Sequence, residues 1–168
     1  MQKQITALLE AFASYPESTE HLRLGSSVSP PATEDDIDLA WGVDLPAELR
    51  ALWRSCSRAV LFKDLDYGQW GLAILTPDAS RRRTARCHVE RPDEFESQDV
   101  VLGEFLGDQE LLVVAPSESG DRRLLIARAL DARREWPAAG RDVTDFLRRY
   151  LAAAGDKYWE VQGKLQEA

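Results

Sequence analysis

The residues best suited to chemistry are a thiol and an imidazole side by side, Cys87 and His88. A cysteine next to a general base could form a nucleophile and base dyad. We expect this segment to be extended, and neighbouring side chains of a strand point to opposite faces, which would separate the two groups. The pair therefore does not predict catalysis.

Ligands for a metal or a nucleotide lack the necessary spacing. The cysteines and histidines stand at positions 21, 56, 87 and 88, without the short repeats of a zinc site. Gly68 and Gly71 are not followed by the Lys-Ser/Thr of a phosphate-binding loop, and no spacing singles out two carboxylates for glycoside hydrolysis. The sequence predicts a non-enzymatic protein without a cofactor or a metal, and His21 is expected to lie in a loop.

The acidic residues are the stronger signal. The net charge is −8 and the pI is near 4.8, which disfavours nucleic acid as a direct partner and favours basic protein surfaces. Between residues 90 and 110 only Arg91 stands against eight acids, which are Glu90, Asp93, Glu94, Glu96, Asp99, Glu104, Asp108 and Glu110. Such a run can serve solubility alone, but it is also the best candidate docking face for a basic partner.

Trp70 close to Asp64 and Asp66 is a second candidate contact region, because interfaces favour aromatic anchors together with charged residues that set specificity. Trp70 could equally belong to the core of a strand. The predicted partner-binding residues are Asp64, Asp66, Trp70, Asp93, Glu94, Glu96 and Asp108.

One basic run, Arg81 to Arg83 with Arg86, contains no aromatic residue of the kind that stacks on nucleic-acid bases. We expect a solvated loop here. The alternative is a contact with the protein's own acidic region or with an acidic partner.

Helices are predicted at both ends of the chain. Ile5, Leu8, Leu9 and Phe12 form a one-sided apolar stripe in a helix over 2–14, and a similar stripe starts after Asp142 in a helix over 142–155. A loop is predicted over 15–32. Thr33 resembles the N-cap of a helix that turns Ile37, Ala40 and Trp41 inward, and Pro46 suits the start of another helix.

The middle of the chain reads as a sheet over 59–127. Its apolar runs are short and rich in residues that favour strands, and the turn-forming pairs between them favour hairpins. The runs are 59–62, 70–75, 100–102, 111–115 and 124–127. We therefore predict one α+β domain over 1–168, an antiparallel curved sheet of about five or six strands with helices packed on one side.

At this point four segments resemble the SUKH family. They are Pro31 to Ile37, Trp41 to Leu49, Gly103 to Leu112 and Asp145 to Leu151. The first two lie in the signature region, 31–62, where the family has a capped helix, a glycine stop, then Leu-Pro and a second helix. Members often carry Asn-Gly or Asp-Gly after that second helix, where this sequence has Ser55 to Arg58.

The resemblance implies a fold with a curved sheet, helices on one side, and a pocket or open face used for protein contacts, and it implies no enzymatic activity. Bacterial members are commonly immunity proteins against secreted toxins, and fungal relatives regulate cell-wall synthesis through protein interactions. The expected function is therefore to neutralise a basic nuclease or deaminase toxin by masking its active site. The alternative is a cytoplasmic regulator or scaffold of the cell-wall-regulator type that binds a cellular protein or a small ligand.

The cellular setting is expected to be the cytoplasm. The sequence has no apolar run long enough to cross a membrane and no signal-peptide pattern, so no membrane partner is expected. Two cysteines could form at most one bridge, and reduced thiols are expected. The oligomeric state is open between monomer and dimer.

Overall fold

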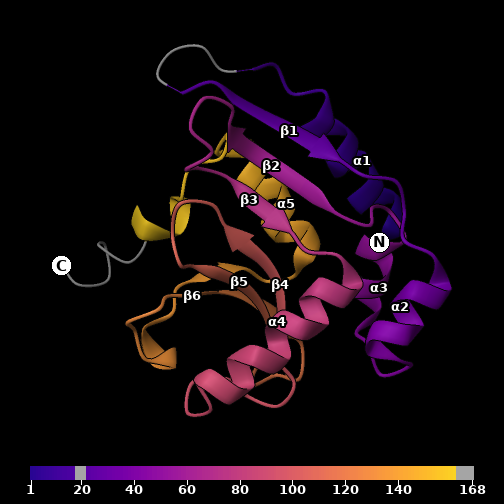
Figure 1. Ribbon diagram of the computed structural model, residues 1–168, viewed down its shortest axis with the longest axis vertical. Coiled ribbons are helices and arrows are strands. Elements are labelled where there is room, and N and C mark those ends of the chain that lie inside the picture. The colour runs from indigo at the N-terminus through magenta and orange to yellow at the C-terminus, as the bar shows by residue number, and fades with distance from the viewer. Residues whose placement is uncertain (18–21, 162–168) are drawn as a thin grey trace.

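The computed structural model describes residues 1–17 and 22–161, and Figure 1 shows the arrangement of its elements. His21 lies outside the described residues. The described helices include α1 (Gln2–Ala13), α2 (Glu34–Trp41), α3 (Ala47–Trp53), α4 (Pro77–Glu90), the 3-10 helix η1 (Arg133–Glu135) and α5 (Val143–Ala152). The described strands are β1 (Leu24–Val28), β2 (Ala59–Asp64), β3 (Leu72–Ile74), β4 (Val100–Phe105), β5 (Leu111–Pro116), β6 (Arg122–Ala127) and β7 (Ala138–Gly140).

The strands form one antiparallel sheet whose spatial order follows the sequence, β1 to β7, with each strand paired to the next. The predicted α+β class and antiparallel sheet are confirmed. The sheet has seven strands rather than five or six because β1 lies within the predicted loop 15–32 and β7 lies beyond the predicted range 59–127. Both strands consist mostly of glycine, alanine or serine, so neither carries the apolar pattern that marks a strand.

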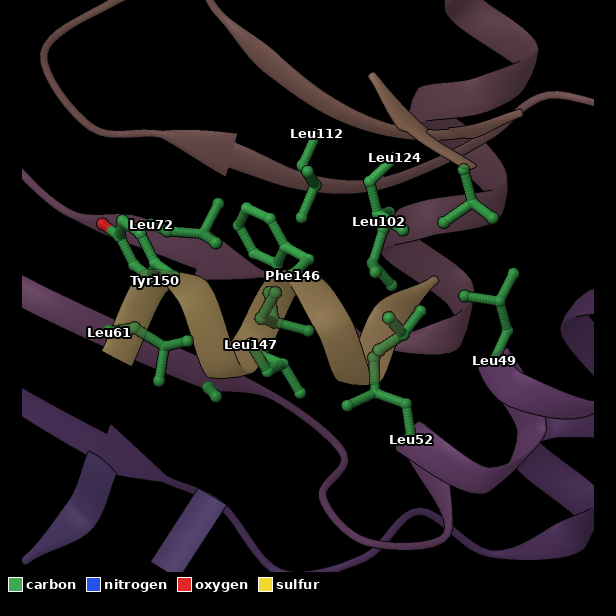
Figure 2. Packing of buried hydrophobic residues seen from close by; sticks show 14 of the residues in the cluster. Leu49, Leu52, Leu61, Leu72, Leu102, Leu112, Leu124, Phe146, Leu147 and Tyr150 are labelled. Carbon is green, nitrogen blue, oxygen red and sulfur yellow. The ribbon is translucent and has the colours of Figure 1, made fainter. Parts of the chain in front are cut away.

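The main core lies between one face of the sheet and helices α1, α3 and α5. Figure 2 shows Phe146, Leu147 and Tyr150 of α5 pointing toward leucines of the strands and of α3. The stripe predicted for α5 is confirmed, since Val143, Phe146, Leu147 and Tyr150 are all buried. The helix runs over Val143–Ala152, a shorter range than the predicted 142–155, and Asp142 caps its start by accepting the Asp145 N–H at 2.7 Å.

Helix α4 lies on the second face of the sheet, which corrects the expectation that helices cover one side only. Side chains of β5 alternate between the two cores: Leu112 and Val114 belong to the main core, whereas Leu111, Val113 and Ala115 pack with Cys87 of α4. A strand buried on both faces reads as an unbroken apolar run, and Leu111 to Ala115 is such a run.

The same helix corrects the expectations of a loop at Arg81 to Arg83 and of an extended Cys87-His88 pair, since α4 contains both. Thr76 caps the helix by accepting the Ala79 N–H at 3.2 Å, and Pro77 occupies its first turn. The buried stripe of α4 includes Ser80, Thr84 and Cys87, which are too small and polar to give an apolar periodicity. Apolar periodicity therefore does not predict this helix.

Two hydroxyls of α4 complete the hydrogen bonds of β4. Strand β3 ends at Ile74, opposite Gly103, so β4 continues beyond its neighbour. There the Thr84 hydroxyl accepts the Val101 N–H at 2.9 Å, and the Ser80 hydroxyl donates to the Val101 carbonyl at 2.6 Å. The helix thus satisfies backbone groups that a longer β3 would otherwise pair.

No helix in the described ranges, 1–17 and 22–161, combines the length and the hydropathy that a transmembrane span requires. The two cysteines are free and lie in different cores, Cys56 in the main core and Cys87 in the second. Burial raises the pKa of the Cys56 thiol to about 12, so this sulfur stays protonated at neutral pH.

Candidate functional site

The predicted acidic face is divided by the fold. Its first five acids follow or end α4, whereas Glu104, Asp108 and Glu110 lie in β4 and the β4–β5 turn. Figure 1 shows the loop after α4 at the lower edge of the molecule, away from the β2–β3 turn. Seven of the eight acids form ion pairs with described residues, and Asp93 is the exception. Most of the negative charge predicted for docking is therefore neutralised within the protein.

The acids after α4 surround Arg133 of η1. The guanidinium binds both oxygens of Asp99, whose side chain is fully buried, and also pairs with Glu96 at 3.1 Å. Glu94 pairs with Arg91 at 3.8 Å, and both Arg91 and Arg133 lie over the ring of Trp136. We call this set the Arg133 cluster. It joins the loop after α4 to η1.

The acids of the β4–β5 turn surround Lys157 instead. Its ammonium binds Asp108 and Glu110, and it lies 5.4 Å from the ring centre of Trp70 and 5.5 Å from that of Phe105. Burial acts to lower the pKa of Lys157, but the hydrogen bonds to the two carboxylates raise it overall. We call this arrangement the Lys157 cage, and it holds a protonated lysine at neutral pH.

The seven predicted contact residues thus lie in separate places. Asp64 is buried, and its Oδ1 accepts the N–H groups of Asp66 and Tyr67, so it shapes the β2–β3 turn. The side chain of Asp66 is half exposed, and its Oδ1 lies 3.7 Å from Nε of Arg23. Glu94 and Glu96 belong to the Arg133 cluster, and Asp93 lies near them in sequence, exposed to solvent.

Trp70 and Asp108 are the two predicted residues that the fold brings to one place. They meet through Lys157, and the Trp70 indole donates to the Gly155 carbonyl at 3.1 Å. Trp70 lies in the bend before β3 and is half buried, so its ring serves the attachment of the C-terminal segment. Gly155 has a φ of +88°, and a Cβ there would lie 2.6 Å from Phe62, so the close approach requires glycine.

Three exposed acids without an ion-pair partner among the described residues lie around α2. Asp35 and Asp36 begin the helix, and Asp44 lies in the turn after it, all three exposed. Leu39 on the same helix is also exposed. Sequence reasoning missed this surface, although one signal was available: Leu39 is a large apolar residue outside the inward stripe of Ile37, Ala40 and Trp41.

Groups that could hold a metal ion are absent from the described ranges, where no cluster of three or more suitable side chains occurs. Cys87 and His88 do not form a dyad. The Cys87 sulfur is buried and lies 3.6 Å from an Arg83 nitrogen, and the His88 ring bonds the Glu96 carbonyl at 2.9 Å. Burial raises the pKa of Cys87, which opposes thiolate formation.

Comparison of the chain with protein-family models finds no match, and a search of the curated proteins likewise finds none. The likeness to the SUKH family therefore rests on the order and spacing of the segments described above.

Proposed function

We propose that this chain is a non-enzymatic, cytoplasmic protein-binding domain of the immunity type, which neutralises a toxin of the nuclease or deaminase class by masking its active site. The observation that carries the proposal is the exposed, unpaired acidic charge around α2, on a protein whose other acidic segment is neutralised internally. Active sites that bind nucleic acid are basic, so this surface is complementary to them.

The order of the elements supports the proposal. Helix α2 is capped by Thr33, which accepts the Asp36 N–H at 3.1 Å, and it stops at Gly42 with a φ of +70°. Pro46 precedes α3, and Asp142 caps α5. These features follow the order of the segments that resemble the SUKH family, and that resemblance implies a pocket or open face used for protein contacts.

Masking requires a preformed surface and no chemical step. Unpaired carboxylates increase the rate of encounter with a basic cleft, and this effect weakens as salt screens the charges. The complex would inhibit by covering the active site, so inhibition should be complete at one domain per toxin.

The test is affinity capture of the purified, tagged chain from the cells that make it, at low and moderate salt. We expect one basic nuclease or deaminase to be recovered and to be released as salt rises. The captured enzyme is then assayed with increasing amounts of the chain, and its activity should fall to zero at equimolar ratio. A bound partner that keeps full activity would contradict the masking function.

A second candidate function is a regulator or scaffold of the cell-wall-regulator type that binds a small ligand or a cellular protein. One observation favours the small-ligand form, a hollow of about 570 Å³ between the start of α3, the β5–β6 turn and the start of α5. It is lined by charges of both signs, including Glu48, Arg122, Arg123 and Asp142. Mass spectrometry of the chain purified under native conditions would detect a bound metabolite, which the immunity function does not require.

A further inference from the structure

We propose that α2, the turn after it and the first turn of α4 form a docking surface for a basic protein segment, which inserts an apolar side chain between α2 and α4. The inference rests on the proposed protein-binding function and adds the location and the chemistry of the contact. We call this region the α2 surface. Figure 1 shows α2 at the outer edge of the molecule, beside α3 and α4.

Two large apolar side chains on the α2 surface are almost entirely exposed. Leu39 in the last turn of α2 keeps 90% of its surface in solvent, and Val43 in the following turn keeps 89%. Beside Leu39 lies a hollow of about 310 Å³, whose apolar lining includes Ala32, Ala40 and Pro77. Exposed apolar side chains gathered at a concave surface with a polar rim are typical of a protein-contact site.

Hydrogen bonds and ring stacking connect the elements that border the hollow. The Trp41 indole donates to the Pro77 carbonyl at 3.1 Å and stacks on the buried Trp53 with ring centres 6.4 Å apart. Trp53 in turn donates to the Leu75 carbonyl at 2.9 Å. These bonds tie α2, α3 and the start of α4 together, so a partner would meet a preformed site and lose less entropy on binding.

The charge around the hollow selects a basic occupant. Asp36 and Asp78 line the hollow. None of Asp35, Asp36 and Asp44 forms an ion pair with a described basic residue. On the neighbouring helices, Arg50, Arg54 and Arg82 are engaged in ion pairs with Glu34, Asp38 and Asp78, and Arg81 lies over the Trp41 ring at 5.1 Å. The unpaired carboxylates of Asp35, Asp36 and Asp44 therefore leave negative charge on α2 and the turn after it.

A second copy of this chain fits the surface poorly. A two-fold contact through α2 would place Asp35, Asp36 and Asp44 of each copy against the same residues of the other, and like charges in contact are repulsive. A segment with lysines or arginines around a leucine- or phenylalanine-like side chain would pair with the free carboxylates and fill the hollow.

Photo-crosslinking in the cells that make the protein tests the location. Benzoylphenylalanine is introduced at Leu39 and, in separate variants, at Tyr67, Asp93 and Leu130. Leu130 is the matched control because it is an equally exposed leucine, at 98%, between β6 and η1. We expect position 39 to crosslink to a protein through a peptide rich in lysine or arginine that also contains a large apolar residue, and position 130 to give no crosslink.

Charge dependence is tested in the same experiment. The triple variant Asp35→Asn, Asp36→Asn, Asp44→Asn should lower the crosslink yield from position 39 several-fold at moderate salt, because it removes the unpaired carboxylates and leaves the apolar residues. With the purified partner, Leu39→Ala should weaken binding by about tenfold and Leu130→Ala should leave it unchanged. All these side chains are exposed, so circular dichroism should show an unchanged fold.

The outcomes separate the two proposals. Crosslinks from Tyr67 or Asp93 but not from Leu39 would overturn the α2 surface and leave the protein-binding function standing. A crosslink from Leu39 to a second copy of the chain or to an acidic peptide would also overturn it. Absence of a crosslink from every position, together with an empty affinity capture, would reject both.

Discussion

Arg133 donates hydrogen bonds to both carboxylate oxygens of Asp99, a residue 34 positions earlier in the chain. The distance from Arg133 Nη2 to Asp99 Oδ1 is 3.0 Å. The Asp99 side chain is fully buried, and its second contact is the Glu96 N–H at 2.8 Å. Burial of an ionised carboxylate is costly unless a partner compensates it, and here a single guanidinium does so. This pair therefore fixes the loop after α4 to η1, although that loop had been the strongest candidate for partner contact.

Loss of Arg133 should be strongly destabilising. Arg133→Ala leaves Asp99 buried without its cation, and we expect the free energy of unfolding to fall by about 3 kcal/mol. Urea denaturation followed by circular dichroism measures the change. The neighbouring Arg134 is exposed and forms no ion pair with a described residue, so Arg134→Ala should change stability by less than about 0.5 kcal/mol. Equal effects of the two substitutions would show that the buried pair does not stabilise the fold.

The hydroxyl of Thr84 should matter more than its shape. Thr84→Val keeps the side-chain volume and the helix propensity but leaves the Val101 N–H without its acceptor, which should cost about 1–3 kcal/mol. Chemical denaturation gives the stability, and hydrogen exchange should show faster exchange at Val101. The reverse swap on the exposed face of α4, Val89→Thr, serves as the control and should be close to neutral. A stable Thr84→Val protein with a protected Val101 amide would contradict the assigned role.

The Lys157 cage should stabilise the C-terminal segment. Lys157→Met removes the cation between Trp70 and Phe105 and its bonds to Asp108 and Glu110. We expect the free energy of unfolding to fall by about 1–2 kcal/mol. The loss is limited because Asp108 is partly solvated and because Glu110 still forms an ion pair with Arg128, at 3.4 Å. Thermal unfolding measures this loss, and Lys63→Met, at an exposed lysine of β2, is the control. A smaller loss for Lys157→Met than for the control would rule out the cage as a stabilising contact.

Stability should depend on pH through Glu48. Desolvation raises the pKa of this carboxyl, whose Oε2 accepts the Val143 N–H at 3.0 Å. A raised pKa means that the folded protein binds the proton more tightly than the unfolded chain does, so stability falls as pH rises from about 4.5 through the raised value. Glu48→Gln keeps an acceptor for the Val143 N–H and should remove this loss of stability at higher pH.

The variant should therefore match the parent protein at pH 4 and exceed its stability at pH 7. Urea denaturation at the two pH values tests this, with Glu118→Gln in the exposed β5–β6 turn as the control. An equal stability difference at both pH values would mean that ionisation of Glu48 is not the cause.

Local patterns were sufficient for much of the fold. The apolar stripe of α1, the Thr33 and Asp142 caps, and the apolar runs of β2, β4, β5 and β6 were all predicted from the sequence. Each of these signals depends on residues within a few positions of one another, through helical periodicity, capping or strand propensity. Sequence therefore determined the α+β class, the antiparallel sheet and the helices at both ends.

The tertiary structure alone decided which acids are neutralised and which remain available. The partners of Asp99, Glu110 and Asp108 are Arg133 and Lys157, which lie 34 to 49 residues away in sequence. Charge counted along the chain therefore placed the docking face at 90–110, whereas the fold leaves unpaired acids beside the exposed Leu39 on α2. The physical reason is that an ion pair depends on distance in space, which residue spacing does not specify for groups so far apart.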